Sequence, residues 1–371
     1  MTDPSCFLPR LVPSYVQAFT PYVPSKPDDV LKKLYGVTHL YRMNNNENAL
    51  GPPTASVQAI ESFMPDMASI YPSGDAYHLR HRLSEIFGLS PCSFIVGNGA
   101  NEVISFVIKA FCAQGDAIIT ADKTFAVYEW VAEFSGCTCT LVPLKNHTFD
   151  PDAILAARDE KTKVIFICNP NNPTGTYWNH ETLCRFLDSV GGEQIVVLDE
   201  AYAEFVSQPD YPDGIKLISK YPNLVVFRTF SKMYGLAGLR IGYLAANQNV
   251  TDIIRRTSVV YSVNGLAQAA ALAALSDNGE HIQRTRDLVR ASRSFLEEEL
   301  DRIHLSYVSG EGNYIMIEVP ISDTLLYRRL MRHGYMVRTM TGFRFPNYIR
   351  VTLHPVPVMK GFLSALTQCI L

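Results

Sequence analysis

The sequence lacks the features of three broad protein classes. Its longest apolar stretch, around residues 265–275, falls short of the ~20 residues that a membrane-spanning helix needs. No basic leader followed by an apolar core precedes the first motifs, so nothing suggests export. The net charge of -3 leaves no basic excess of the kind that binds nucleic acid or anionic lipid. We therefore expect no membrane partner and no nucleic-acid partner.

Cysteine usage excludes a further class of site. The eight cysteines are scattered, and the only close pair, Cys137 and Cys139, has no second pair to complete a metal site. We therefore expect no bound metal, and we expect reduced thiols in a cytoplasmic protein.

The length and the residue patterns predict two domains and an arm. A chain of 371 residues suits about two domains. Residues 1–44 form a proline-punctuated arm with one short helix at Asp28–Tyr35. Residues 45–274 alternate strands with helices, and the apolar runs at 164–168, 195–198 and 224–227 are typical of parallel strands buried on both faces. This pattern predicts an α/β fold with a doubly wound, mostly parallel sheet, followed by a smaller α+β domain at 275–371.

Chemically distinctive residues follow the predicted strands. The turn 97–102 opens a helix, whose free N–H groups and dipole suit a phosphate. Asp199 closes an apolar strand, where a carboxylate is costly without a cation or a donor. Ser231 and Lys232 follow the next strand, and Arg240 lies eight residues further on.

Each of these features also has a plainer interpretation. The glycine turn and the Asn- and Pro-rich loop at 168–175 are good turns, Asp199 suits a helix cap, and most lysines are solvated. The carboxyl ends of parallel strands meet in one crevice, however, so phosphate donors, a carboxylate, a phenol and an amine come together. That combination predicts a pyridoxal-phosphate site with Lys232 as the Schiff-base lysine.

These motifs give the chain a resemblance to a known family. It resembles the fold-type-I aminotransferases, and within them the histidinol-phosphate aminotransferases. The resemblance covers nearly the full length. The residues that carry it are 20–27, 46–52, 71–72 with 79–80, 97–102, 124–128, 171–175, 199–202 and 231–240.

The resemblance implies a role for each matched residue around the cofactor. Lys232 binds the cofactor and moves the proton, while Asp199 keeps the pyridine nitrogen protonated so that the ring accepts electrons. Tyr202 and Asn172 hydrogen-bond the phenolic oxygen of the ring, and Tyr128 stacks on its face. The phosphate is held by Ala100, Asn101, Thr229, Ser231 and Arg240.

The resemblance also implies a homodimer with shared active sites. Tyr71 reaches the phosphate in the partner subunit, and Tyr22 on the arm closes the neighbour's substrate pocket. Arg350 and Arg338 are the candidates for binding the substrate anion, since a guanidinium fork suits carboxylate and phosphate alike. Asn48 is expected at the substrate as well. Asn313 matches a position near the pocket, but an ordinary strand start explains it equally well.

The implied function is transamination in two half-reactions. Glutamate donates an amino group and leaves as 2-oxoglutarate, and imidazole-acetol phosphate becomes histidinol phosphate in histidine biosynthesis. Two stretches depart from the family pattern, at 260–262 and at 353–357, and both lie near the place where the resemblance implies the substrate or the partner subunit.

Three alternatives remain open. One is an aminotransferase for aromatic amino acids or specialised metabolites. Another, a related phosphothreonine decarboxylase, fits the string Asn46–Asn48 less well. The third is a regulator that binds the cofactor without turnover. Such regulators usually contain a DNA-binding domain as well, and the residues before the first motif do not have the pattern of one.

Overall fold

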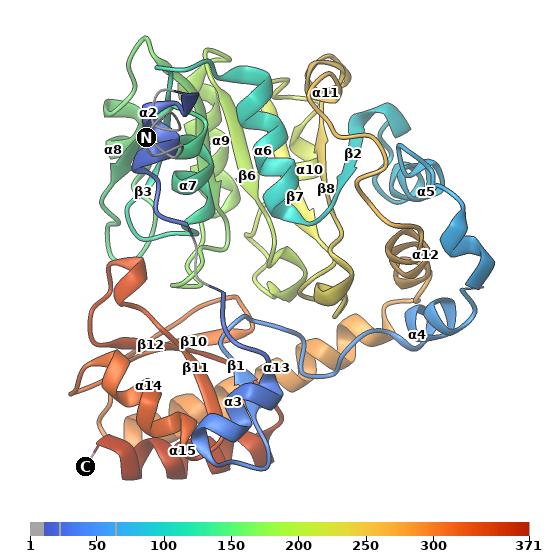
Figure 1. The fold of residues 1–371 in the computed structure, drawn as a ribbon. Helices are drawn as coiled ribbons and strands as arrows, with labels where there is room; N and C mark the ends of the chain where they lie inside the picture. The colour runs from blue at the N-terminus through green and yellow to red at the C-terminus, as the bar shows by residue number, and fades with distance from the viewer. Residues whose placement is uncertain (1–10, 22–23, 64, 371) are drawn as a thin grey trace, which may run out of the picture.

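A seven-stranded sheet forms the centre of the larger part of the molecule. The computed structural model describes residues 11–21, 24–63 and 65–370 (Figure 1). Within them, the strand order is β2 (Phe94–Gly97), β8 (Gly242–Ala246), β7 (Leu224–Thr229), β6 (Ile195–Asp199), β5 (Thr162–Cys168), β3 (Ala117–Ala121) and β4 (Thr138–Val142). Only β8 runs against the others. The expected doubly wound, mostly parallel sheet is confirmed.

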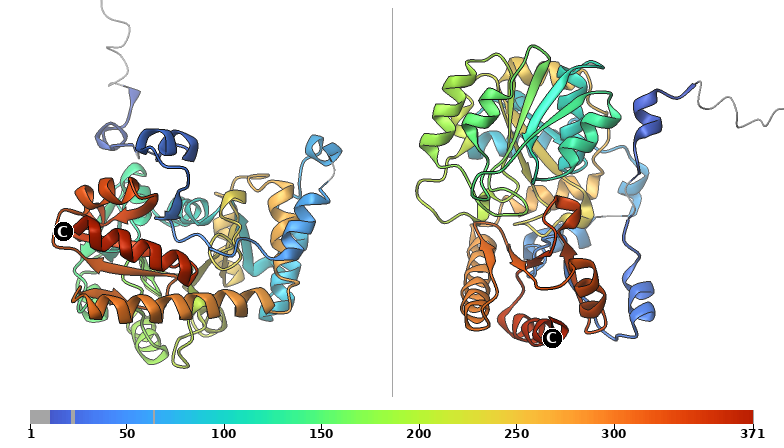
Figure 2. Two further views of the ribbon diagram at one scale, coloured as in Figure 1. Left: turned by 90° about the horizontal axis from the view of Figure 1, so that it is seen from below. Right: turned by 90° about the vertical axis from the view of Figure 1, so that its left-hand side faces the viewer.

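The sequence explains why these strands lie at the centre. The runs in β5, β6 and β7 are rich in Val, Ile and Leu and are almost entirely buried, because helices lie on both faces of the sheet (Figure 2). These helices include α6 (Ala100–Phe111), α7 (Val127–Phe134), α8 (Pro151–Ala156), α9 (His180–Val190), α10 (Gly214–Leu217) and α11 (Gln248–Arg255). Another group of helices, α4 (Thr54–Glu61), α5 (Tyr77–Phe87) and α12 (Gly265–Ala274), packs together beside β2 (Figure 1).

The antiparallel strand β8 is an element that our sequence analysis did not anticipate. In its sequence, Gly-Tyr-Leu-Ala-Ala, three of the five residues are Gly or Ala, which have a low preference for strands. Its pairing with both β2 and β7 holds it in the sheet.

A five-stranded sheet forms the centre of the smaller part. Its order is β1 (Tyr41–Met43), β11 (Tyr335–Thr339), β12 (Tyr348–Thr352), β10 (Tyr314–Glu318) and β9 (Tyr307–Ser309). Side chains of α13 (Glu280–Arg302), α14 (Asp323–Met331) and α15 (Val356–Ile370) share an apolar core with it. Helix α3 (Asp28–Tyr35) packs here too, through Leu31 against Met331 and Met336. Part of the arm therefore lies with the smaller sheet, while the domain bounds at 44 and 274 stay predictions.

The start of the arm contacts the larger part of the same chain. Helix α2 (Ser14–Ala18) lies on α7, and the rings of Phe19 and Phe134 meet edge to face at 5.6 Å. Tyr22 lies outside the described residues, so its role at a neighbour's pocket stays a prediction. None of the helices in the described ranges has the length and apolar character to span a bilayer.

Two distant segments cross at a pair of glycines. Gly235, in the loop after β7, has φ = 62°, and a Cβ on it would lie 2.3 Å from the carbonyl oxygen of Gly51. Only glycine fits at such a contact, because both the backbone conformation and the space exclude a side chain. The crossing fixes the segment that contains Asn45 beneath the loop that carries Lys232.

We expect Gly235→Ala to destabilise the protein, because the new methyl group would meet backbone that cannot move aside. The cost should be about 2 kcal/mol, which corresponds to a fall of roughly 3 °C in the apparent Tm. Gly238→Ala is the matched control, since Gly238 lies in the same loop, has an ordinary φ and has open space around it. Thermal unfolding followed by circular dichroism measures both, and equal Tm values for the two variants would contradict the argument.

Candidate active site

The half-buried Lys232 side chain lies just beyond the carboxyl end of β7. It follows β7 by three residues, and its Nζ donates to the carbonyl oxygen of Asn45 at 2.6 Å. The amine also lies 6.0 Å from the centre of the Tyr202 ring. Burial lowers the pKa of Lys232 to about 8, and the positive charges of Arg350 and Arg240 act in the same direction. An amine with this pKa exchanges protons readily near neutral pH.

Asp199 provides a carboxylate that lacks a cationic partner. It ends β6 and is 3% exposed. Its Oδ1 accepts the N–H of Ala201 at 3.0 Å, and its Oδ2 accepts the hydroxyl of Tyr128 at 2.5 Å. Burial raises the pKa of Asp199, while these two hydrogen bonds oppose the rise. Within the described residues Asp199 forms no ion pair, so the site can accept a cationic group here.

Tyr128 occupies a different place from the one that the resemblance implied. Its side chain is 0% exposed, its ring stacks on Phe166 at 4.8 Å, and its hydroxyl binds Asp199. A ring that is completely enclosed has no face to offer a ligand, so this placement does not support the expected stacking role. The half-buried aromatic ring in this segment is Phe125, which lies edge-on to Tyr128 at 5.5 Å.

Tyr202 and Asn172 form hydrogen bonds with residues that are distant in the sequence. The Tyr202 hydroxyl accepts Nδ2 of Asn46 at 2.8 Å, and burial raises the pKa of Tyr202 well above its usual value. The side-chain oxygen of Asn172 accepts Nη1 of Arg350. The larger sheet, the smaller sheet and the 44–48 segment therefore meet at one point.

The phosphate-binding candidates lie together at the start of α6. Gly99 has φ = 83°, and a Cβ on it would lie 2.3 Å from Nη2 of Arg240, so the guanidinium rests directly against this glycine. Ala100 and Asn101 follow as the first two residues of the helix, where backbone N–H groups lack intrahelical partners. Thr229 Oγ1 accepts the N–H of Ser231 at 3.1 Å, and both residues are buried at the end of β7. This arrangement can hold a dianion at a helix N-terminus.

Arg338 and Arg350 form a second anion-binding candidate. They are direct partners on β11 and β12, and their guanidinium groups lie 5.6 and 5.8 Å from the centre of the same ring, Phe343. Arg350 is buried, donates to the carbonyl oxygen of Asn44 at 2.7 Å and has an Nε without a partner. No acidic side chain of the described residues pairs with either arginine. Because two adjacent cations repel, an anionic ligand is the natural complement.

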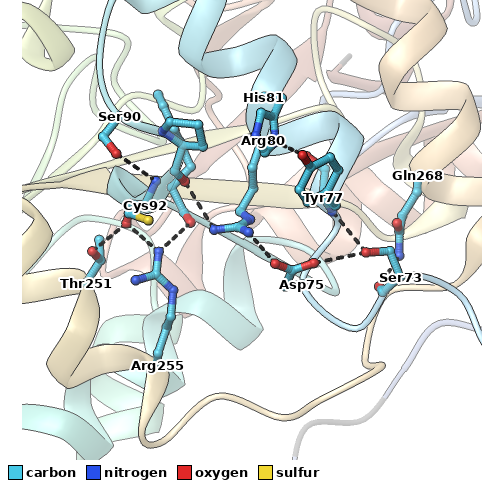
Figure 3. Close-up of polar contacts among 12 residues, drawn as sticks. Ser73, Asp75, Tyr77, Arg80, His81, Ser90, Cys92, Thr251, Arg255 and Gln268 are labelled. Carbon is cyan, nitrogen blue, oxygen red and sulfur yellow. Dashed lines mark hydrogen bonds and ion pairs between the residues drawn. The ribbon is translucent and has the colours of Figure 1, made fainter.

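Tyr71 lies on the surface rather than in the crevice. It is 81% exposed, and its ring lies 5.0 Å from that of Tyr261, which belongs to one of the two divergent stretches. Figure 3 shows the polar network that holds the chain just after it. Arg80 pairs with Asp75, and Asp75 accepts the hydroxyl of Ser73 at 3.0 Å.

The remaining candidates support the 44–48 segment. Nδ2 of Asn48 donates to the carbonyl oxygen of Met233 at 2.7 Å and to Thr285 at 3.2 Å, so its substrate role stays a prediction. Nδ2 of Asn313 donates to the carbonyl oxygens of Asn46 and Glu47, each at 3.2 Å. In the second divergent stretch, His354 binds the carbonyl oxygen of Arg42 at 3.0 Å.

Sequence reasoning missed the backbone carbonyl of Asn45 and the side chain of Thr124. Thr124 donates to Asn171 at 2.7 Å. Both residues lie within or beside motifs that carried the resemblance, which was the only available signal.

Comparison with known proteins identifies the family. The model of the aminotransferase class I and II family matches residues 38–366. This chain belongs to that family.

Curated relatives match this aminotransferase over most of its length. It is 38% identical to the histidinol-phosphate aminotransferase of Anaeromyxobacter sp. over 345 residues, which cover 92% of this chain and 94% of the relative. It is 36% identical to that of Caldicellulosiruptor saccharolyticus, with 95% and 98% covered.

Solved structures share the fold of the aminotransferase. The structure of histidinol-phosphate aminotransferase from Sinorhizobium meliloti in complex with pyridoxal-5'-phosphate has a TM-score of 0.86 and 24% identity, with 96% of each chain covered. Thermus thermophilus aspartate aminotransferase with maleate has a TM-score of 0.81 and 21% identity, with 96% and 99% covered. These likenesses establish the fold.

We expect the Lys232 amine to titrate near pH 8 in the ligand-free aminotransferase. Since only a neutral amine reacts with acetic anhydride, labelling of Lys232 should rise through this pH, as peptide mass spectrometry would measure. Arg350→Gln removes a positive charge that lowers this pKa, so the midpoint should move to higher pH. Lys220, whose pKa is raised by its hydrogen bond to Tyr221, is an internal control that should not respond. An unchanged Lys232 midpoint in the variant would contradict the electrostatic account.

Proposed function

We propose that the chain is a pyridoxal-phosphate-dependent L-histidinol-phosphate:2-oxoglutarate aminotransferase of histidine biosynthesis. One observation carries the proposal: a half-buried amine, a buried carboxylate without a cationic partner and a helix N-terminus with Arg240 against it lie at the ends of β7, β6 and β2. The names of the relatives, which cover more than nine-tenths of the chain at 36–38% identity, support the choice of substrate.

The residues of the crevice fit pyridoxal phosphate. Asp199, buried without a cation, suits the pyridine nitrogen in its protonated form. Lys232 would hold the aldehyde carbon, and Tyr202 with Asn172 would hold the phenolic oxygen. The start of α6 with Arg240, Thr229 and Ser231 would hold the phosphate. When bound, the cofactor supplies a ring that withdraws electrons from the substrate's α-carbon.

The residues of the chain then perform three tasks. Lys232 takes and returns a proton at Nζ, and its lowered pKa suits both directions. Asp199 holds a positive charge in place without water competing for it. Arg350 and Arg338 bind and orient the substrate through its anion. Because glutamate brings a carboxylate and histidinol phosphate a phosphate, one pair of arginines serves both half-reactions.

A homodimer with shared active sites is part of the proposal. Ile70, Tyr71, Val260 and Tyr261 are each at least half exposed, and the rings of the two tyrosines lie together. An exposed apolar group of this kind is typical of an interface. Tyr71 of each chain would reach the phosphate held by the other. The proposal includes a cytoplasmic location, which follows from the expected state of the cysteines.

Substrate choice can be tested directly against the aromatic alternative. With glutamate as donor, we expect imidazole-acetol phosphate to have the higher kcat/KM, because Arg338 and Arg350 together favour a phosphate. A preference for phenylpyruvate of more than about a hundredfold, about 2.7 kcal/mol, would contradict the assignment. Absence of turnover with every acceptor would favour a cofactor-binding protein without activity.

Two substitutions separate the roles of Asp199 and Tyr128. Asp199→Asn should lower kcat by roughly a hundredfold or more, since it removes the charge opposite the pyridine nitrogen. Tyr128→Phe keeps the ring and removes one hydrogen bond to Asp199, so kcat should fall by roughly tenfold. Stopped-flow measurement of the glutamate half-reaction gives both values. A Tyr128→Phe variant with the wild-type rate would show that the hydroxyl contact is unimportant and would restore the stacking interpretation.

A further inference from the structure

The two candidate substrate arginines belong to one hairpin of the smaller sheet. Arg338 on β11 and Arg350 on β12 are connected by residues 340–347, which include the short 3-10 helix η6 (Thr341–Phe343). Phe343, in this connection, lies beneath both guanidinium groups. The position of the connection therefore determines where the substrate anion is held.

The connection is anchored firmly within its own domain. Asp323, the first residue of α14, is buried and accepts three hydrogen bonds from it. Its Oδ2 accepts the backbone N–H groups of Met340 and Thr341, each at 2.8 Å, and its Oδ1 accepts the hydroxyl of Thr341 at 2.8 Å. Three hydrogen bonds to a carboxylate make the connection move with the smaller sheet.

Arg344 joins the same connection to the larger domain. Its Nη1 donates to the carbonyl oxygen of Asp122 at 2.9 Å, and its Nη2 lies 2.7 Å from Oε1 of Glu129 on α7. Next to it, Nζ of Lys123 lies 5.3 Å from the centre of the Phe345 ring. The hairpin strands β11 and β12 lie in the smaller domain, below β3 and α7 of the larger one (Figure 1).

The segment that Arg344 binds leads straight to the candidate cofactor site. Residues 122–129 contain Thr124, which donates to Asn171, and Tyr128, which donates to Asp199. Arg344 thus links the hairpin of the substrate arginines to the groups around the proposed cofactor. The Arg344 side chain is 46% exposed, so its ion pair with Glu129 adds little to the free energy of unfolding. The contact instead affects the position of the hairpin.

We propose that Arg344 is a positioning residue for substrate binding, which holds the Arg338–Arg350 hairpin at a set distance from the cofactor site through Asp122 and Glu129. The inference rests on the proposed function, because it assumes that the substrate anion binds to these arginines. Arg344 itself touches neither substrate nor cofactor in this account.

The test compares Arg344→Ala and Glu129→Gln with the wild-type protein, using glutamate and 2-oxoglutarate. In each variant, the KM for glutamate and the KM for 2-oxoglutarate should rise by roughly tenfold, because Arg338 and Arg350 are no longer held at a fixed distance from the cofactor site. The kcat at saturation should change by less than about twofold. The Kd of 2-oxoglutarate for protein with the aldehyde form of the cofactor, measured by calorimetry, should rise equally. This keto acid does not react with that form, so its Kd reports binding alone.

Controls separate positioning from general damage. Arg302→Ala removes an ion pair with Glu299 that lies within one turn of α13 and crosses no domain boundary, so KM and Kd should be unchanged. The double variant Arg344→Ala with Glu129→Gln should lose no more than Arg344→Ala alone, because Arg344→Ala already removes the ion pair that Glu129→Gln weakens. The Tm of each variant should match that of the wild type within about 2 °C.

The outcomes distinguish this proposal from the proposed function. If the wild-type protein transaminates but neither variant changes KM or Kd, or if kcat falls while KM stays constant, the positioning role is wrong. If the wild-type protein neither transaminates nor binds 2-oxoglutarate, the proposed function fails, and the inference fails with it.

Discussion

The partial removal of the Lys232 amine from water is the constraint on which the rest of the site depends. Desolvation of an ammonium group is costly, so the pKa of Lys232 falls to about 8, and Arg350 and Arg240 add to the fall. The amine keeps one hydrogen bond, to the carbonyl oxygen of Asn45. That contact requires the 44–52 segment to pass beneath the lysine loop, and the crossing of Gly51 and Gly235 is what permits it. The reactivity of one amine thus depends on backbone packing between distant parts of the chain.

The larger sheet could be predicted because the sequence patterns that indicate its strands lie within short segments of the chain. Continuous apolar runs identify β5, β6 and β7, and polar residues that directly follow them, such as Asp199, lie at a common edge. Strand β8 was not predicted because three of its five residues are Gly or Ala, which have little preference for a strand, and its pairing with two neighbouring strands holds it in place. Helix α3, by contrast, begins at Asp28 and ends at Tyr35, as its pattern indicates.

The candidate site could be predicted as a set of residues but not as a set of contacts. The hydroxyl of Tyr128 meets Asp199 across 71 positions of the sequence, and no pattern within either segment encodes that meeting. Arg344 is a harder case, since an arginine in a surface turn has no distinguishing context. Its contacts with Asp122 and Glu129, from which its proposed role is argued, form only because the packing of both sheets brings the two domains together.

The central claim is that Lys232 holds a cofactor that exchanges an amino group with glutamate. Visible absorption spectroscopy of the purified protein reconstituted with pyridoxal phosphate tests it most directly. The account predicts that L-glutamate abolishes the visible band of the bound cofactor, that 2-oxoglutarate restores it, and that Lys232→Ala shows neither change at a comparable rate. A band that stays constant with glutamate and with every other amino donor would contradict the account.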